Sequence, residues 1–345
     1  MISEWRKQLE RYGAVIEDGQ LVSFGDARAE AAAADQDVIA DLSHYGLLQV
    51  TGPDAAEFLQ GQLTNDIRQV SPGRSQLSAY CNPKGRMLAV VRVIRRGSTF
   101  LLQMPLSRLA PVQLRLGMYV MRADVQLQNA SEDLVRIGLS GEVAAGRLRE
   151  IVDQVPDSVS EVRDGPVTVL RLPGAKPRFE LIAEPAMAFE LWHRLGDLPA
   201  VGPDVWGLLD ALAGVPEVHE ATVEAFVPQM ANLDLVGGVS FTKGCYTGQE
   251  VVARSHYLGK VKRRMYGLSM GTGPRPEPGE AIVQVNDLHE PAQVGRVVAA
   301  FPDAAGGYRG LAVLQTSADA TALHLARADG PTLVLETLPY ELPAD

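Results

Sequence analysis

The stretch LVRIGLSGEVAAGRLREIVDQV, residues 134–155, has a short apolar run followed by a longer run with helical spacing, and so predicts a strand and then a helix. Two more strand-like runs follow, PVTVLRL at 166–172 and RFELIA at 178–183, and then a second helical run, PAMAFELWHRL at 185–195. A strand-helix-strand-strand-helix order is typical of α+β proteins, and here it resembles a split ferredoxin-like unit. We therefore expect a ferredoxin-like α+β domain over residues 134–200.

Upstream of this segment, strands and a helix are again expected. Residues 37–50, DVIADLSHYGLLQV, predict a connector and a strand. Gly52 and Pro53 then lead into residues 54–63, where Phe58, Leu59 and Leu63 share one helix face. Residues 78–104 carry two apolar runs around the turn residues 96–98, which predicts a β-hairpin preceded by a turn at 82–85.

Downstream of Lys260 the chain consists of short strand-like runs separated by Gly, Pro, Asp and Asn. This pattern predicts a small antiparallel barrel or sandwich.

Composition limits the classes of function. The chain has 345 residues, 46% hydrophobic and 21% charged, which is typical of a globular protein with a sizeable core. The N-terminus lacks the apolar run of a signal peptide, and no run reaches the roughly 20 residues of a membrane span, so we expect a cytoplasmic protein with no membrane partner. A net charge of −10 argues against binding nucleic acid over the whole surface.

Cysteine and histidine usage argues against a metal site within the chain. Cys81 and Cys245 are the two cysteines, and no CxxC pair occurs, so neither a disulfide framework nor a four-thiolate site can form. The six histidines show no metal-binding spacing. We predict no metal site, and we expect Cys81 to be structural.

Residues 226–254, FVPQMANLDLVGGVSFTKGCYTGQEVVAR, are the most informative for function. A Gly-Gly turn and a short apolar strand are expected to deliver Cys245 to a second turn. Thr247 and Glu250 have the spacing of a capping box, which predicts a helix that begins at Gly248. The helix N-terminus and the Lys243 ammonium would both favour the thiolate of Cys245. The alternative is that Cys245 is a buried small hydrophobe.

The octapeptide KGCYTGQE, residues 243–250, resembles the signature of the YgfZ family of folate-binding proteins, which are related in fold to the aminomethyltransferase of glycine cleavage. Further similarities occur in family order over most of the chain: LLQVTGPDAAEFLQGQLTND at 47–66, YCNPKGRM at 80–87, FVPQMANL at 226–233 and LPY at 338–340.

The resemblance implies an α+β, three-domain ring with ferredoxin-like units, and tetrahydrofolate or a one-carbon derivative in its central channel. On this basis residues 1–133 plus 201–258 form a discontinuous folate-binding domain, residues 134–200 the ferredoxin-like domain and residues 259–345 the C-terminal β-barrel. Cys245 is carried over as the functional thiol near the channel, together with Lys243.

Aromatic residues lie near the folate in this family, and Tyr45 and Trp206 occupy the matching positions. Flat rings suit a pterin or aminobenzoyl face. We assign Tyr246, Gln249 and Glu250 to the same folate site. Without the resemblance, Tyr45 and Trp206 would be interpreted as core aromatics.

Two departures from related enzymes concern catalysis. Folate enzymes of this fold commonly carry Glu where this chain has Leu212, which affects the expected anchor for the pterin. Aminomethyltransferases place a catalytic aspartate shortly after the turn that matches 82–86, whereas this chain continues with the apolar residues 87–90. An apolar side chain cannot exchange a proton with the reacting folate, so we do not expect glycine-cleavage chemistry.

Three functions remain open. The first is an accessory protein that binds tetrahydrofolate and supports assembly or repair of iron–sulfur enzymes, such as those that methylthiolate tRNA, without binding nucleic acid directly. The second is a folate-dependent one-carbon transferase or demethylase with Cys245 as nucleophile. The third is a folate reservoir or interaction module in which the cysteine is incidental.

A basic cluster follows the signature and has several possible uses. It could meet a folate glutamyl tail, RNA phosphates or an acidic partner, or it could be a solvated charged strand. Its members are Arg254, His256, Lys260, Lys262, Arg263 and Arg264.

Overall fold

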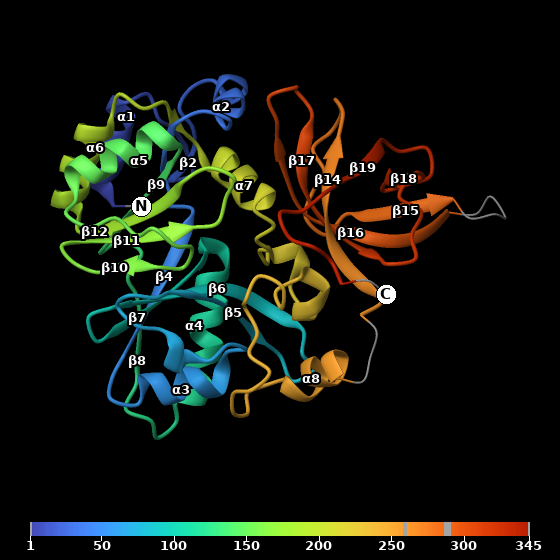
Figure 1. The fold of residues 1–345 in the computed structure, drawn as a ribbon, viewed down its shortest axis with the longest axis horizontal. Coiled ribbons are helices and arrows are strands. Elements are labelled where there is room, and N and C mark those ends of the chain that lie inside the picture. The colour runs from blue at the N-terminus through green and yellow to red at the C-terminus, as the bar shows by residue number, and fades with distance from the viewer. Residues whose placement is uncertain (1, 258–260, 286–290, 344–345) are drawn as a thin grey trace. The chain divides into compact units, whose positions relative to one another are not determined.

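The computed structural model describes residues 2–257, 261–285 and 291–343 (Figure 1). The chain divides into two compact units, each built from several segments. The first contains residues 1–59, 67–76 and 91–209, and the second contains residues 60–66, 77–90 and 210–345. The expected division into three domains stays a prediction, and its boundary at residues 258 and 259 lies outside the described residues.

A six-stranded sheet forms the centre of the first unit, in the order β10-β11-β12-β9-β3-β13. The order predicted for residues 134–195 is confirmed: β9, α5, β11, β12 and α6 follow one another, with the two-residue β10 added. One strand from outside the predicted 134–200 segment joins this sheet, because β3 pairs with β9. Strand β13, which begins at the last residue of the segment, pairs with β3. The bounds are β3 Val38–Asp41, β9 Val135–Ser140, α5 Glu142–Ile151, β10 Val162–Arg163, β11 Val167–Leu172, β12 Arg178–Ala183, α6 Pro185–Leu195 and β13 Ala200–Val201.

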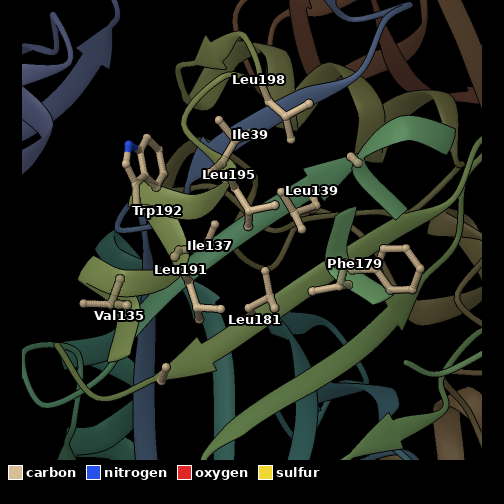
Figure 2. Close-up of a cluster of buried hydrophobic side chains, with 14 of the residues drawn as sticks. Ile39, Val135, Ile137, Leu139, Phe179, Leu181, Leu191, Trp192, Leu195 and Leu198 are labelled. Atoms are coloured by element: carbon tan, nitrogen blue, oxygen red, sulfur yellow. The ribbon is translucent and has the colours of Figure 1, made fainter. Parts of the chain in front are cut away.

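One hydrophobic core cluster of this unit lies on one face of the sheet. Helices α1 (Ser3–Arg11), α5 and α6 gather over β9 and β12 (Figure 1). Side chains alternate between the two faces of a strand, so every second residue of β9 points toward these helices. Figure 2 shows Leu191, Trp192 and Leu195 of α6 lying over this layer. Burial of each such side chain stabilises the fold by roughly 1.5–3 kcal/mol.

A second sheet has the order β5-β6-β7-β4-β8. The predicted hairpin is confirmed, since β6 and β7 pair antiparallel with Arg96 opposite Thr99. The predicted helix after Gly52 is α3, in which Phe58 and Leu59 are buried as expected. Leu63 is also buried, but it lies just beyond the helix, in a bridge with Tyr80, and so does not share the helix face. The bounds are β4 Tyr45–Thr51, α3 Ala55–Gln62, β5 Gln76–Cys81, β6 Met87–Arg96, β7 Thr99–Pro105, α4 Leu106–Val120 and β8 Gln126–Asn129.

The C-terminal strands form a closed barrel in the order β14-β17-β16-β15-β18-β19, shown in orange and red in Figure 1. The predicted barrel is therefore confirmed, and the sandwich alternative is wrong, because β14 pairs with both β17 and β19 and leaves no open edge. The bounds are β14 Arg263–Met270, β15 Ala281–Val285, β16 Pro291–Pro302, β17 Tyr308–Gln315, β18 Leu323–Leu325 and β19 Thr332–Glu336.

The remaining elements are short. They are β1 Val15–Glu17, β2 Gln20–Ser23, α2 Ala27–Ala33, α7 Pro203–Leu212 and α8 Gln249–Tyr257, with 3-10 turns at Ile67–Gln69, Glu220–Thr222 and Pro228–Ala231. Within the described parts of the chain, every helix is too short or too polar to cross a membrane.

Candidate functional site

Cys245 lies in a loop of the second unit, just before α8. Its thiol is free and the residue is exposed, which rules out the alternative of a buried small hydrophobe. Cys81 is also a free thiol, but it is 1% exposed within β5, and burial raises the pKa of its thiol to about 12. Cys245 is therefore the accessible thiol of the two.

Lys243 has a role that its sequence position did not predict. Its Nζ donates to the backbone carbonyls of Gln60, Leu63 and Asn65 at 2.6, 2.5 and 3.1 Å. The last carbonyls of a helix lack partners within it and carry partial negative charge, so an ammonium at the end of α3 is favourable. Nζ also lies 5.0 Å from the ring centroid of Tyr246. Lys243 therefore anchors the cysteine loop to the end of α3, and its predicted effect on the Cys245 sulfur stays a prediction.

The upstream end of the loop is fixed by residues 64 and 65. Thr64 Oγ1 donates to the Gly238 carbonyl at 2.8 Å, and Asn65 Nδ2 donates to the Gly237 carbonyl at 2.7 Å. The Ser240 amide donates to the Thr64 carbonyl at 3.0 Å. The short strand expected after the Gly-Gly turn is absent from residues 239–242, because side-chain and single backbone hydrogen bonds replace a strand ladder.

The downstream end of the loop is fixed by Gly248. The predicted capping box is wrong: the Glu250 carboxylate accepts from Arg254 at 3.1 Å, one turn along the exposed face of α8. The helix begins at Gln249 because Gly248 adopts φ +85°, outside the helical region. A Cβ on Gly248 would lie 2.4 Å from the Asn82 carbonyl oxygen, so only glycine allows this approach.

The two turns that meet at Gly248 belong to separate sequence motifs. Asn82 Oδ1 accepts from the amides of Lys84 and Arg86 at 2.9 and 3.0 Å, which confirms the predicted turn at 82–85. Gly85 lies against Gly248 and the Val251 side chain. The motif at 80–87 and the signature at 243–250 therefore form one packed structure.

The motif at 226–233 forms hydrogen bonds to both α8 and β14. Gln229 Nε2 donates to the Val252 carbonyl at 2.6 Å, and Asn232 Nδ2 donates to the Met265 carbonyl at 2.7 Å. Arg264 is buried and binds Asp234 at 2.8 Å, so it does not belong to the exposed part of the predicted basic cluster. Lys260 of that cluster lies outside the described residues.

The other predicted residues of this unit differ in accessibility. Tyr246 is 7% exposed, and burial raises the pKa of its hydroxyl. Gln249 is half-buried and Glu250 is exposed. Gln249 and Glu250 thus have polar groups within reach of a ligand, whereas the Tyr246 ring is enclosed beside Lys243.

Tyr45 and Trp206 belong to the first unit and are both buried. Tyr45 begins β4, is 6% exposed and has its ring centroid 4.3 Å from that of His44. Trp206 is 1% exposed, with the Arg178 guanidinium 4.4 Å from its ring centroid. Binding of a ligand to the face of Trp206 would require Arg178 to move away. The assignment of both aromatics to a folate site stays a prediction.

Buried charges on β9 and β12 were not predicted from the sequence. Glu180 lies two residues from Arg178 on the same face of β12, and Arg136 of β9 is opposite Ile182, all at buried positions that alternate with the hydrophobic core residues. Burial lowers the pKa of Arg136, while Asp41 and Glu180 oppose that shift. The sequence did contain a sign of these buried charges: Arg136 lies inside LVRIGL, and Arg178 and Glu180 lie inside RFELIA. Strands buried on both faces seldom contain charged residues without a partner.

Metal ligands do not gather in the parts of the chain that the structure describes: no three of its His, Cys, Asp or Glu side chains are grouped to hold an ion.

Comparison with known proteins agrees with the motifs. The model of the GCVT N-terminal domain family matches residues 12–174. The tRNA-modifying protein YgfZ of Colwellia psychrerythraea is 32% identical over 306 residues, covering 88% of this chain and 94% of the relative. The protein of the same name from Escherichia coli O157:H7 is 31% identical over 303 residues, covering 87% and 92%.

A solved structure supports the same fold. The glycine cleavage system aminomethyltransferase T from Bartonella henselae superposes with a TM-score of 0.79 at 18% identity, covering 98% of this chain and 97% of that one. Such a low identity bears on fold alone, whereas the two relatives match nearly their whole length. The chain therefore belongs to the YgfZ family and has an aminomethyltransferase-like fold.

Proposed function

We propose that this chain is a tetrahydrofolate-binding accessory protein that supports assembly or repair of iron–sulfur enzymes, including enzymes that modify tRNA. Its relatives carry the name tRNA-modifying protein, and the GCVT domain match favours a folate ligand. The observation that carries the proposal is the exposed thiol of Cys245 on a loop that is fixed at both ends.

The proposed use of Cys245 is contact with a partner protein or its cluster. Thiolates bind iron and exchange with disulfides, and both reactions require access from outside. Clusters usually need four protein ligands, and Cys81 is buried. Any cluster contacted by Cys245 would therefore take its remaining ligands from another chain.

An accessory role is favoured over aminomethyl transfer by the start of β6. The residues that follow the 82–86 turn, Met87 to Val90, are all buried and apolar. No acid is available at these positions to exchange a proton with a folate nitrogen.

The fit of a folate is partial. Gln249 and Glu250 offer polar groups for hydrogen bonds, whereas the Trp206 ring is enclosed by Arg178. Tetrahydrofolate would supply one-carbon chemistry when bound. We assign the residues of this chain only to binding it, and to presenting Cys245.

The test compares Cys245→Ala with Thr242→Ala, an exposed control three residues upstream. Each variant is expressed in cells that lack the endogenous protein, and methylthiolated tRNA nucleosides are quantified. We expect Cys245→Ala to lose function while its urea unfolding curve and tetrahydrofolate affinity remain those of the unaltered protein, since removing one exposed sulfur changes little packing. Retained tRNA modification would refute the role of the thiol.

The same proteins distinguish the second candidate, a one-carbon transferase or demethylase. Purified protein is incubated with tetrahydrofolate and its one-carbon derivatives, and the products are followed by chromatography. Conversion that is lost in Cys245→Ala would replace the accessory proposal with an enzyme. Absence of any folate binding would leave an interaction module.

A further inference from the structure

A cavity of about 500 Å³ lies at the outer edge of the six-stranded sheet, within the first unit. Helices α5 and α6 pack mainly on β9, and α6 also packs on β12, whereas β11 and β10 continue the sheet beyond them. The cavity lies where this helical cover ends, and its lining comes from the end of α5, from β10 and β11 with the turn between them, and from α6. Its volume is within the range of sites that bind small molecules.

The floor of this cavity is apolar. Val167 and Val169 of β11 are two residues apart, so both side chains point to the face of the sheet that carries the helices. Leu191 of α6 lies over the same face (Figure 2), and Met187, one turn earlier, is exposed at the cavity wall. The floor therefore offers an apolar surface to the side chains of a ligand.

The rim of the cavity carries exposed charges of both signs. Glu190 and Asp153 form no hydrogen bond or ion pair with any residue that the structure describes. Arg194 also lacks an ion pair among the described residues, and its guanidinium donates to the Glu150 carbonyl at 3.4 Å. Two carboxylates and one guanidinium are thus available to a ligand at this rim.

The other charged residues of the lining already have partners. Arg163 forms an ion pair with Glu161. The Asp164 carboxylate accepts from the Gly97 amide and the Thr168 hydroxyl, each at 2.8 Å. A ligand would therefore meet Glu190, Asp153 and Arg194 first.

We propose that this cavity binds an apolar dipeptide as a zwitterion. Its ammonium would meet Glu190 and Asp153, its carboxylate would meet Arg194, and its side chains would cover the valines of the floor. Glu190 and Arg194 are one turn apart on α6, with Cβ atoms about 5–6 Å apart, and two extended residues span at most about 7 Å. The two ends of a dipeptide therefore match this spacing. The proposal involves neither folate nor Cys245, so it is independent of the proposed function.

Other small ligands fit the rim less well. An apolar anion would gain Arg194 but would be repelled by Glu190 and Asp153, and an apolar cation would be repelled by Arg194. A single amino acid carries its two charges closer together than one helical turn, so it would not reach Glu190 and Arg194 at the same time.

The experiment titrates the full-length chain with four peptides in a calorimeter: leucyl-leucine, its N-acetyl form, its C-terminal amide and seryl-serine. Leucyl-leucine should bind about threefold to fivefold more tightly than either blocked form, because an exposed charge pair contributes modestly. It should bind at least about tenfold more tightly than seryl-serine, which has no apolar side chain to bury. The double variant Asp153→Asn, Glu190→Gln should lose the preference over the N-acetyl form, and Arg194→Gln should lose the preference over the amide. The matched control is Glu184→Gln, at an exposed glutamate just before α6 and outside the lining.

Several outcomes would overturn the proposal. Absence of binding by all four peptides at millimolar concentration would remove the site. Tighter binding of the N-acetyl form would make it a site for anions, and tighter binding of the amide would make it a site for cations. Preferences that the rim variants leave unchanged would place the peptide elsewhere on the protein. The substituted residues are exposed, and urea unfolding of each variant checks that the fold is retained. Cys245→Ala should bind leucyl-leucine normally, so failure here is separable from failure of the proposed function.

Discussion

Replacing Gly248 by alanine should disrupt the structure that holds Cys245. Gly248 has φ +85°, and an L-residue in left-handed backbone costs roughly 1–2 kcal/mol. Its Cβ would also lie 2.4 Å from the Asn82 carbonyl oxygen and 2.9 Å from the Gly85 amide nitrogen, both backbone atoms. Forcing such a group into packed structure typically costs about 1–3 kcal/mol. Gly248→Ala should therefore cost about 2–5 kcal/mol locally.

The matched control is Gly244→Ala, in the same loop. A Cβ on Gly244 would meet no atom within 4 Å, so we expect a change of at most about 1 kcal/mol there. Because a chain of two units need not unfold in a single step, local hydrogen exchange is the better measurement. The amides of Lys84 and Arg86, which donate to Asn82, should exchange roughly 30-fold faster in Gly248→Ala for a local loss of about 2 kcal/mol.

Equal exchange rates in the two alanine variants would contradict this reasoning. They would mean that the contact between Gly248 and the 82–85 turn does not determine the stability of the loop. Slower exchange in Gly248→Ala would refute it more strongly.

Three more changes test other contacts. Lys243→Met removes three hydrogen bonds from a buried ammonium, but it also removes the cost of desolvating that charge. Urea unfolding should therefore show a net loss of stability of about 2–4 kcal/mol. A loss of stability below about 0.5 kcal/mol would exclude the anchoring role. Tyr340→Phe removes the 2.9 Å hydrogen bond to the Gly214 carbonyl and should cost about 1 kcal/mol in the same assay, with no change if the hydroxyl is irrelevant. Burial, with a smaller effect of Arg275, lowers the pKa of His219 from 6.5 to about 4, so the unfolded chain takes up its proton first as the pH falls. Protonation of His219 in the unfolded chain should thus lower the stability of the folded protein by about 2 kcal/mol between pH 7 and pH 4.5. His219→Gln should lose less stability than the unaltered protein over this pH range. Equal losses of stability would refute the burial of His219 as the cause.

Much of the fold was predictable from local sequence patterns. The strands and helices over 134–195, the hairpin around Gly97 and the short strands of the C-terminal segment all follow from apolar periodicity and turn residues, which depend on near neighbours. The pairing of β3 with β9 was not predictable, because it joins segments about a hundred residues apart. The apolar pattern of a strand does not indicate which other strand it pairs with.

The candidate site was also only partly predictable from the sequence. The motif at 243–250 identified Cys245 from the sequence, but its exposure depends on which surfaces pack around the loop. The capping box at Thr247 and Glu250 had the right spacing and was still wrong: Gly248, packed against the Asn82 carbonyl, has φ +85°, and the Glu250 carboxylate accepts from Arg254.

By itself, the sequence determined the element order over residues 134–195, the antiparallel strands of the C-terminal segment, the family motifs and the cysteine on which the proposed function depends. Tertiary structure alone decided that Lys243 binds the end of α3, that Arg178 covers Trp206, and that the C-terminal strands close into a barrel. The physical reason is that backbone preference and periodicity act over a few residues, whereas burial and the satisfaction of a charge depend on residues that folding brings together.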